Sequence, residues 1–344
     1  MRAPYRVGLL GLGNVGGALA RRLVEDADRI TTAAGRRIAL EAIAVANAGG
    51  RRAPAPLLAA AQLLAQPQLD AIVEVMGGLE PAHTYISAAL LAGRDVITAN
   101  KQLIAAEGPQ LARLGPLRFE ASVASAIPIV ETLAETLAAD RVGSIMGILN
   151  GTTNSILAAM DEGASYADAL ADAQRRGLAE ADPSADVDAH DPAAKLAILA
   201  MLAFGRRIDP STIVRVGIRD LGQTQLRAAR ERGCVVKLIA SAQILHGVGI
   251  EADVRPRLIP LDAPMAHVDG AMNAIAIDAM YAGLMLLQGL GAGPDAAASA
   301  VLADLVRAAR DMPASAGERL ASLSDQLTAT IAPLRTRVPY PAAS

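Results

Sequence analysis

The start of the chain holds the pattern that most restricts its fold. A short apolar strand over Tyr5–Leu10 runs into the glycine turn Gly11-Leu-Gly13-Asn-Val-Gly16, and a helix over Val15–Glu25 follows. Strand, G-x-G-x-x-G and helix together are typical of a dinucleotide-binding unit, because the glycines let the backbone approach a pyrophosphate at the helix N-terminus. A glycine turn with a purely structural role is the alternative interpretation.

Strands and helices continue to alternate as far as residue 123. We predict strands over Ala42–Ala46, Ala71–Val75, Asp95–Thr98 and Leu117–Val123, and helices over Ala55–Leu64, Pro81–Leu91 and Gln102–Leu114. This alternation predicts an α/β fold with a parallel, doubly wound sheet whose ligand lies beyond the carboxyl ends of the strands. Lys101 follows one of those ends, so we expect it to face the cofactor crevice. A surface lysine at a helix start is the alternative.

The end of the second strand bears on the choice of dinucleotide. Asn47 stands where an acid would hold the ribose 2′-hydroxyl of NAD, and Arg51 and Arg52 follow. An uncharged residue with arginines nearby suits a 2′-phosphate, which favours NADP over NAD. Arginines that only decorate a Gly/Pro-rich loop are the alternative.

A second pattern begins near residue 130. A helix over Pro128–Leu137 and a strand over Gly143–Leu149 lead to the turn Asn150-Gly-Thr-Thr-Asn154, where we expect Thr153 or Asn154 to cap the next helix. Later segments predict a hairpin around His246-Gly247, then strands and a last long helix: Val235–Ala242, Val248–Val254, Ala274–Ile277, Met280–Leu287 and Asp295–Arg310. An antiparallel sheet with helices on one face is expected here.

These patterns divide the chain into domains. Residues 1–130 form the dinucleotide-binding domain, completed by a returning helix at about 293–312. Residues 131–292 are expected to form an α+β domain, and residues 313–344 a C-terminal tail.

The stretch Gly177–Ala200 carries the strongest chemical signal. Five carboxylates fall between residues 180 and 191 with no Lys or Arg among them: Glu180, Asp182, Asp186, Asp188 and Asp191. Asp191 precedes Pro192, which predicts a helix N-cap, and it forms an i, i+4 pair with Lys195. The apolar run Leu196–Phe204 predicts that this helix is buried. An acidic, solvated loop with a helix-start salt bridge is the alternative.

The lysine content strengthens the chemical interpretation of this stretch. The chain has 32 Lys and Arg residues, but only Lys101, Lys195 and Lys237 are lysines. Arginine stays protonated in proteins, whereas a partly desolvated lysine can release and regain a proton. A lysine kept among the acids therefore indicates proton chemistry.

The composition also excludes several classes of protein. A net charge of −3 gives no reason to expect nucleic acid binding, and four scattered histidines make no metal-ligand spacing. The single cysteine, Cys234, excludes an internal disulfide and fits a reducing compartment. No apolar run reaches membrane-spanning length, and the N-terminus does not resemble a signal peptide. We therefore expect a cytoplasmic protein.

Taken together, these segments resemble homoserine dehydrogenase over about Tyr5 to Arg310. The resemblance is carried by GLGNVGGAL, EVMGGLEPA, ITANKQLIA, GILNGTTNSIL, GLAEADPSADVDAHDPAAKLAILA and VDGAMNAI, of which the NGTTN turn and the acidic block are the specific parts. It implies a Rossmann-type first domain and an NAD(P)-dependent oxidoreductase. The family interconverts L-homoserine and L-aspartate 4-semialdehyde in threonine, methionine and isoleucine biosynthesis.

The resemblance also implies roles for individual residues. Lys195 would be the acid–base residue with Asp191 beside it, Lys101 would be its companion near nicotinamide, and substrate would be held by Glu180, Asp186 and Asp191. The cofactor would contact Gly11, Gly13, Asn14, Val15, Gly16, Gly77, Thr98, Asn100, Lys101, Gly177 and Gly291. A monovalent cation, Na⁺ or K⁺, would be held by Glu120 and the segment containing Val123, Ser125 and Ile127.

The sequence departs from the family pattern at three places. Ala189 and Ser125-Ala126 stand where relatives usually have glycine, and Ala296-Ala297 stands where they have Pro-Thr. A non-catalytic paralogue that binds cofactor and an amino acid, or a related oxidoreductase for another amino-acid-derived alcohol or aldehyde, therefore stays open.

Two expectations about regulation and assembly come from the resemblance. The family implies a homodimer, with substrate binding, catalysis and dimerisation in residues 131–292. The chain ends at residue 344, before the regulatory ACT domain that many relatives carry, so we expect no feedback by L-threonine through such a domain. Strong inhibition on titrating L-threonine would contradict this expectation.

Overall fold

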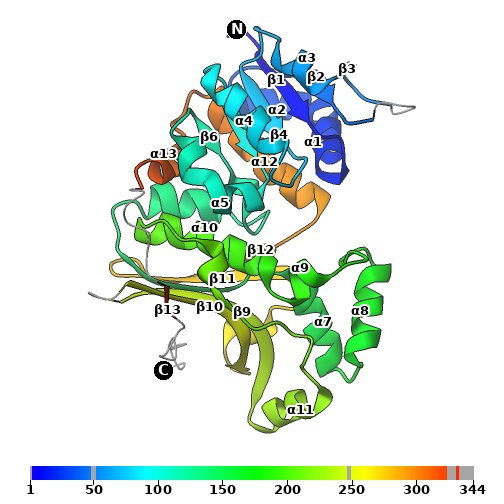
Figure 1. Ribbon diagram of the computed structural model, residues 1–344, viewed down its shortest axis with the longest axis vertical. Helices are drawn as coiled ribbons and strands as arrows, with labels where there is room; N and C mark the ends of the chain where they lie inside the picture. The colour runs from blue at the N-terminus through cyan, green and yellow to red at the C-terminus, as the bar shows by residue number, and fades with distance from the viewer. Residues whose placement is uncertain (1, 48–51, 246–248, 324–330, 333–344) are drawn as a thin grey trace. The chain divides into compact units, whose positions relative to one another are not determined.

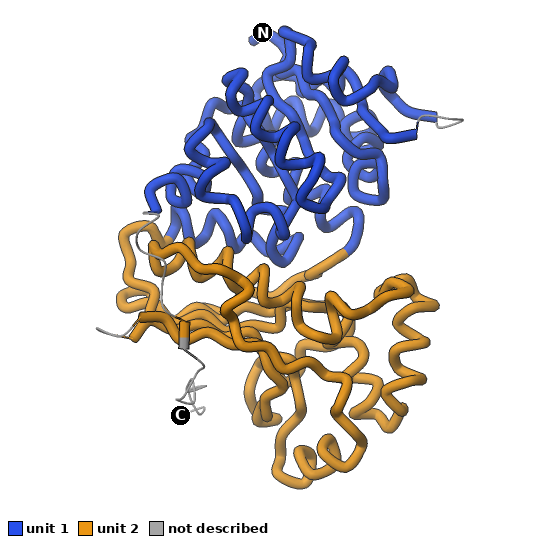
Figure 2. The backbone as a smooth tube through the Cα atoms, in the orientation of Figure 1, with its two compact units in different colours: residues 1–136, 293–324 blue, residues 137–292, 325–344 orange. Residues whose placement is uncertain are grey.

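The structure is a computed structural model that describes residues 2–47, 52–245, 249–323 and 331–332 (Figure 1). Predictions that involve Arg51, the His246-Gly247 turn and most of the tail lie outside these residues. The chain forms two compact units (Figure 2). Unit 1 comprises Met1–Thr136 and Gly293–Ser324, and unit 2 comprises Leu137–Ala292 and Asp325–Ser344.

Unit 1 is built on a six-stranded parallel sheet in the order β3-β2-β1-β4-β5-β6. Its strands are β1 (Tyr5–Leu10), β2 (Ile38–Ala44), β3 (Leu57–Leu58), β4 (Ala71–Glu74), β5 (Asp95–Thr98) and β6 (Leu117–Arg118). The order runs in opposite directions on the two sides of β1. Because crossovers between parallel strands are right-handed, the helices of the two halves cover opposite faces. The predicted α/β fold with a doubly wound parallel sheet is confirmed.

The helices of unit 1 fall into two packed groups. The first comprises α1 (Asn14–Glu25), α2 (Ala27–Ala34) and α12 (Pro294–Ala309), and the second comprises α3 (Ala60–Leu64), α4 (Ala82–Leu91) and α5 (Lys101–Ala112). The core of the first group joins apolar side chains of β1 to those of α12, including Leu9, Val301 and Leu305, which are fully buried. The short helices α6 (Ile129–Glu131), η2 (Thr132–Thr136) and α13 (Ser315–Ala321) complete the unit.

Two local predictions in unit 1 are wrong, and one helix was not predicted. The segment predicted as a helix over Ala55–Leu64 begins with β3, and the helix starts only at Ala60, because Pro54 and Pro56 disfavour helix in the residues around them. The last strand ends at Arg118, and Glu120–Ser122 form the 3-10 helix η1 instead of continuing it to Val123. Helix α2 is absent from the predicted elements.

Unit 2 is built on a mixed sheet in the order β12-β11-β7-β9-β10-β13, with β8 also beside β10. Its strands are β7 (Val142–Ile148), β8 (Val214–Arg215), β9 (Cys234–Leu245), β10 (Gly249–Pro260), β11 (Met272–Ala279), β12 (Gly283–Leu290) and β13 (Ile331–Ala332). The five longer strands pair antiparallel, as predicted, whereas β8 and β13 lie parallel to β10. The last hairpin strand begins at Gly283, so Met280 lies before it rather than within it.

The helices of unit 2 include those that carry Asp186, Asp191 and Lys195. They are α7 (Gly151–Asp161), α8 (Tyr166–Arg175), α9 (Ser184–Val187), α10 (His190–Phe204) and α11 (Gln223–Glu231). Helix α10 contacts β7, β9 and β10, and its apolar residues from Leu196 to Leu202 are fully buried. The prediction of a buried helix after the acidic stretch is confirmed. In the part of the chain that is described, no helix has the length and apolar character needed to cross a bilayer.

Candidate active site

The glycine turn of unit 1 is shaped for a close backbone approach. Gly11 has a left-handed φ of 104°, and a Cβ on Gly16 would lie 2.1 Å from the carbonyl oxygen of Gly11. Gly16 therefore cannot carry a side chain without displacing the turn. A Cβ on Gly13, the N-cap of α1, would meet nothing within 4 Å, so the helix start is open on that side. This arrangement fits a dinucleotide pyrophosphate.

Glu74 joins three of the predicted cofactor residues at the carboxyl edge of the same sheet. Its buried carboxylate accepts the backbone N–H of Gly77 at 3.0 Å and the hydroxyl of Thr98 at 2.6 Å. The Thr98 hydroxyl oxygen in turn accepts the N–H of Asn100, whose side-chain amide donates to the Gly78 carbonyl at 2.6 Å. Gly77, Thr98 and Asn100 therefore form one connected edge. Sequence reasoning missed Glu74, which looked like an ordinary strand residue.

Lys101 follows this network as the first residue of α5. Its neighbour Asn100 caps the helix by accepting the N–H of Leu103, and the Lys101 side chain is half-buried. The lysine thus sits on a rigid helix start in unit 1.

A surface hollow lies beside the glycine turn. Arg52 lines it together with Leu12, Gly17, Ala20, Arg21, Val24, Glu25 and Pro54. Of the two cations in this lining, Arg21 is paired with Asp295 at 2.7 Å and with Glu25 at 3.8 Å. Arg52 is exposed, so its guanidinium is accessible to an anionic group.

The acidic block of unit 2 is gathered by one amide side chain. Asn150 Nδ2 donates to Asp186 Oδ1 at 2.6 Å and to Asp191 Oδ2 at 2.9 Å. Asn150 is also the N-cap of α7, since its Oδ1 accepts the N–H of Thr153 at 2.8 Å. Thr153 and Asn154, the predicted caps, lie within the helix. An Asn directly before a helix is itself an N-cap signal, so this residue could have been found from the sequence.

Lys195 lies at the centre of this group. Its Nζ is 2.8 Å from Asp191 Oδ2 and donates to the Leu149 carbonyl oxygen at 2.8 Å. The lysine side chain is 9% exposed and that of Asp191 is 4% exposed, so solvent screens the pair little. The predicted i, i+4 contact is confirmed. Asn150, Asp186, Asp191 and Lys195 therefore form one connected cluster.

The start of α10 differs from the prediction. The helix begins at His190 rather than after Asp191, and its N-cap is Ala189 in a left-handed conformation with φ of 65°. Asp191 therefore lies inside the first turn. The left-handed residue turns the chain so that Asp191 points at Asn150 and Lys195 instead of capping the helix with its side chain.

The other acids of the block have different environments. Arg219 Nε donates to Asp188 Oδ1 at 2.5 Å and Nη2 donates to Oδ2 at 2.9 Å, and this hydrogen bonding lowers the pKa of the Asp188 carboxyl. Asp182 accepts the N–H of Ser184, which lowers its pKa. Glu180 is exposed, on a segment tied to α7 because the Thr152 hydroxyl donates to the Leu178 carbonyl at 2.7 Å. Arg219 was not foreseen from the sequence.

Gly177 and Gly291 have structural reasons of their own to be glycine. Gly177 has a left-handed φ of 70°, and a Cβ added there would meet nothing within 4 Å. A Cβ on Gly291 would lie 1.9 Å from the Asn273 side chain, so the amide of Asn273 packs directly on the glycine. Contact with the cofactor is thus not the only explanation for either residue.

The predicted cation segment is arranged around Glu120. Its two carboxylate oxygens accept the N–H groups of Val130 at 2.9 Å and Glu131 at 3.0 Å, at the start of α6. The Ile127 carbonyl accepts the N–H of Ile129. Burial raises the pKa of the Glu120 carboxyl, and the hydrogen bonds from these backbone N–H groups oppose that shift only in part. Ser125 has a left-handed φ of 43°, and no group of three or more His, Cys, Asp or Glu side chains suited to a metal ion occurs among the described residues.

These two sites offer complementary chemistry. The glycine turn and the edge around Glu74 fit a dinucleotide. The unit 2 cluster offers carboxylates for a cationic group and a buried amine for proton transfer.

Comparisons with known proteins agree with this chemistry. The family model described as "Homoserine dehydrogenase" matches residues 128–306, and the one described as "Homoserine dehydrogenase, NAD binding domain" matches residues 11–116. The homoserine dehydrogenase of Mycobacterium tuberculosis is 41% identical over 321 residues, which are 90% of this chain and 73% of that protein. That of Corynebacterium glutamicum is 42% identical over 319 residues, covering 89% of this chain and 72% of that protein.

Solved structures give the same result. A homoserine dehydrogenase from Thiobacillus denitrificans matches with a TM-score of 0.89 and 39% identity, over 96% of this chain and 80% of that one. A hyperthermophilic archaeal homoserine dehydrogenase in complex with NADPH matches with a TM-score of 0.76 and 26% identity, over 90% of this chain and 99% of that one.

Proposed function

The chain belongs to the homoserine dehydrogenase family of oxidoreductases, and we propose that Lys195 carries the proton transfer of its reaction. Homoserine dehydrogenase interconverts L-homoserine and L-aspartate 4-semialdehyde. The observation that supports the proposal is the buried Lys195 amine held at 2.8 Å by Asp191, inside a cluster of acids that suits an amino-acid substrate.

The acids of unit 2 are proposed to bind the α-ammonium of the substrate. Asp186 and Asp191 both reach the same Asn150 amide, so their carboxylates lie close together and concentrate negative charge. Glu180 is exposed on the segment anchored by Thr152, where its carboxylate can swing toward a ligand. A cationic group with several carboxylates around it makes strong charge-assisted hydrogen bonds. Asn150 acts as a positioning residue, because it fixes the two aspartates.

The hydroxyl of homoserine must lose its proton as hydride leaves the same carbon. A neutral Lys195 amine within hydrogen-bond reach would accept that proton, and a protonated one would return it when the aldehyde is reduced. Asp191 and the Leu149 carbonyl hold the amine in place for both directions. Lys101 is proposed as a second cation near nicotinamide and substrate.

The nicotinamide dinucleotide supplies the hydride acceptor and donor. Residues of unit 1 proposed to hold it are Gly11, Gly13, Asn14, Val15, Gly16, Gly77, Thr98 and Asn100, with Lys101 beside them. Gly177 and Gly291 of unit 2 are further proposed contacts. The required glycine at Gly16 and the edge organised by Glu74 support this assignment.

Substitution of Lys195 tests the proton-transfer role. We expect Lys195→Ala to lose roughly 10²–10⁴-fold in kcat, the usual contribution of general acid–base catalysis, while the Kd for NADPH measured by fluorescence stays within about twofold of the wild-type value. Lys195→Arg keeps the charge but cannot exchange the proton, so it should be comparably slow. A Lys195→Ala variant with near-normal kcat would exclude the role. If the wild-type protein formed no NADPH with homoserine, the chain would be better explained as a non-catalytic paralogue. A higher rate with another amino alcohol would identify that alcohol as the substrate.

We propose NADP as the preferred cofactor. Asn47 in place of an acid, and exposed Arg52 in the hollow beside the glycine turn, support a 2′-phosphate. Initial rates with NADP⁺ and NAD⁺ side by side test the preference. Arg52→Ala should raise the KM for NADP⁺ roughly tenfold and leave that for NAD⁺ unchanged, since one charge-assisted hydrogen bond is lost. Equal effects on both cofactors would contradict the assignment.

The monovalent cation at Glu120 is a separate proposal that rests on the resemblance. The Glu120 carboxylate already accepts two helix N–H groups, and the proton transfer proposed for Lys195 does not depend on a cation there. Rates measured in potassium, sodium and choline chloride at equal ionic strength test it, and identical rates in all three would exclude the cation.

We also propose that the protein works as a cytoplasmic homodimer. The single cysteine suits a reducing compartment. The edge strand β12 carries the exposed apolar side chains Leu284, Leu286 and Leu290, which suit burial in a second copy. Light scattering on the purified protein measures the assembly.

A further inference from the structure

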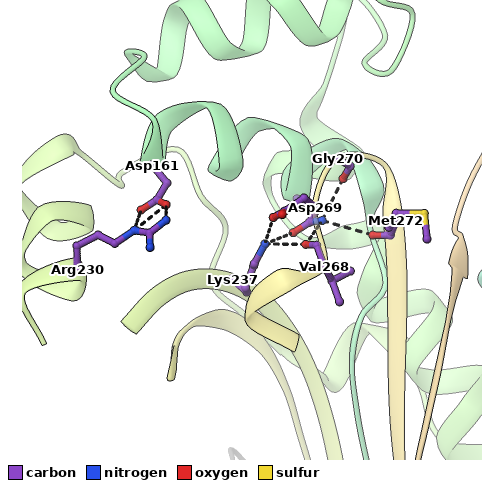
Figure 3. Close-up of polar contacts among 8 residues, drawn as sticks. Asp161, Arg230, Lys237, Val268, Asp269, Gly270 and Met272 are labelled. Carbon is purple, nitrogen blue, oxygen red and sulfur yellow. Dashed lines mark hydrogen bonds and ion pairs between the residues drawn. The ribbon is translucent and has the colours of Figure 1, made fainter. Parts of the chain in front are cut away.

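The third lysine of the chain, Lys237, lies in a polar cluster that the proposed reaction does not use. It projects from β9 with its side chain 4% exposed. Its Nζ donates to the Val268 carbonyl at 2.7 Å, to Asn154 Oδ1 at 3.2 Å and to Asp269 Oδ1 at 3.2 Å (Figure 3). The three acceptors surround one ammonium, which has three N–H donors. The planar guanidinium of arginine cannot take this geometry.

Asn154 is the partner through which Lys237 can act at a distance. While its Oδ1 accepts from the lysine, its Nδ2 donates to the carbonyls of Val268 at 2.8 Å and Gly270 at 3.0 Å (Figure 3). Because an ammonium only donates, it fixes which way the amide of Asn154 faces. Lys237 and Asn154 together clamp the loop Val268–Met272.

This clamp reaches the acid cluster through the first turn of α7. Asn154 lies in that turn, where its backbone N–H donates to the carbonyl of Asn150, the residue whose amide holds Asp186 and Asp191. The clamped loop also supports the turn directly, since a Cβ on Gly151 would lie 2.7 Å from the Ala271 carbonyl oxygen. The loop therefore contacts the first turn of α7 at two residues, Gly151 and Asn154.

We propose that Lys237 is a positioning residue for substrate binding. Its ammonium sets the orientation of Asn154, Asn154 and the loop fix the start of α7, and α7 presents the Asn150 amide to the two aspartates. This inference rests on the proposed role of those aspartates. Burial lowers the pKa of Lys237 and the Asp269 carboxylate opposes that shift, which is consistent with a charged group held in a desolvated place by its partners.

The test compares Lys237→Met with wild type in full steady-state kinetics. Loss of the ammonium should loosen Asn154 and raise the KM for L-homoserine roughly tenfold, as expected for losing a hydrogen bond to a charged group. The KM for NADP⁺ should stay within about twofold of wild type. A purely structural role would lower the active fraction, and hence the apparent kcat, without moving either KM. Unchanged KM for homoserine would overturn the proposal.

A neighbouring ion pair provides the matched control. Arg230 pairs with Asp161 in the same region of unit 2, but its side chain is 48% exposed, whereas that of Lys237 is 4% exposed (Figure 3). Arg230→Met should leave both KM values unchanged. An equal rise in homoserine KM in this variant would show that any loss of charge in this region has the effect, and would overturn the specific role of Lys237.

A double-mutant cycle tests whether Lys237 acts through Asn154. Asn154→Ala should raise the homoserine KM by itself, and the double variant with Lys237→Met should be no worse, because both substitutions break the same link. Additive increases would overturn the proposed path. If Lys237→Met does not fold, Asn154→Ala carries the test, and a normal homoserine KM in that variant overturns the proposal.

The outcome can be separated from that of the proposed function. Normal kinetics in Lys237→Met together with an inactive Lys195→Ala would overturn only the positioning role. Normal turnover in Lys195→Ala would instead overturn the proposed proton transfer.

Discussion

At the scale of single residues, the backbone at Ala189 decides where Asp191 points. Ala189 is buried with a left-handed φ of 65°. A left-handed conformation costs an L-residue about 1–2 kcal/mol, and glycine avoids this cost. The alanine is therefore kept in a strained conformation by its surroundings, which include the contact of Asp191 with Lys195.

Replacement of this alanine should relieve the strain. We expect Ala189→Gly to raise the free energy of unfolding by about 0.5–1 kcal/mol, after subtracting the greater backbone entropy of unfolded glycine. Ala171→Gly, inside helix α8, is the control and should lower it by about 1 kcal/mol. Urea unfolding measures both. Destabilisation by Ala189→Gly as large as in the control would show that the left-handed residue carries no strain.

Lys237 makes a prediction about pH. Burial lowers its pKa in the folded protein below the ordinary value of 10.5. Between the lowered pKa and 10.5 the unfolded chain binds more protons than the folded one, so stability rises with pH in that window. Relative to Lys237→Met, wild-type protein should gain stability as the pH is raised toward 10.5. Thermal unfolding of both proteins across the alkaline range measures the difference, and a difference independent of pH would contradict it.

At the scale of elements, the glycine turn and α1 behave as one unit. Only some of its glycines are required by packing: a Cβ at Gly16 would collide with the Gly11 carbonyl at 2.1 Å, whereas a Cβ at Gly17 would meet nothing within 4 Å. Both residues belong to α1, so they differ in surroundings rather than in secondary structure.

This contrast predicts opposite effects of one substitution at adjacent positions. Gly16→Ala should displace the turn, lower stability by about 1–3 kcal/mol as overpacking does, and weaken NADP⁺ binding. Gly17→Ala should raise stability by about 0.5–1 kcal/mol, because alanine favours helix over glycine. Calorimetric unfolding and cofactor titration measure both variants. Equal destabilisation would mean that the close approach at Gly16 does not constrain the turn.

The acidic loop is also held in place by contacts with a distant segment of the chain. Ile218 donates its N–H to the Val187 carbonyl at 2.9 Å, and a Cβ on Gly217 would lie 2.2 Å from that same oxygen. Together with the pair between Arg219 and Asp188, these contacts hold the loop against residues 217–219. Two segments distant in sequence, Asn150 and residues 217–219, therefore hold the acidic loop.

At the scale of the whole molecule, assembly is expected to depend on the edge of the unit 2 sheet. Leu284, Leu286 and Leu290 are 51%, 38% and 53% exposed and lie on one face of β12, since alternate residues of a strand face the same way. An exposed edge strand with apolar side chains is a natural pairing surface.

A double substitution on this strand tests the homodimer. We expect Leu284→Asp with Leu286→Asp to weaken association roughly 100-fold or more, from the loss of two buried leucines. Leu91→Asp is the control. Leu91 lies on a helix of unit 1 and is 71% exposed, so this substitution should leave association unchanged. Size-exclusion chromatography with light scattering measures both. A wild-type monomer, or a double variant that dimerises normally, would contradict the prediction.

By itself, the sequence determined the parts of this protein that depend on neighbouring residues. The alternation of apolar strands and helices, the glycine turn before α1, the buried helix α10 and the contact of Asp191 with Lys195 all follow from spacing along the chain. Element ends were less well predicted where prolines or a 3-10 turn intervened, as at β3 and η1. Such ends depend on small differences in local free energy.

Only the tertiary structure decided which side chains act together. Asn150 reaches Asp186 and Asp191 across 36 and 41 residues, Lys195 meets the Leu149 carbonyl across 46, and Lys237 meets Asn154 across 83. Glu74 likewise gathers Thr98 from the next strand. No local pattern encodes these partners, because each hydrogen bond forms only after packing of the sheets and helices has brought distant segments within about 3 Å and removed competing water.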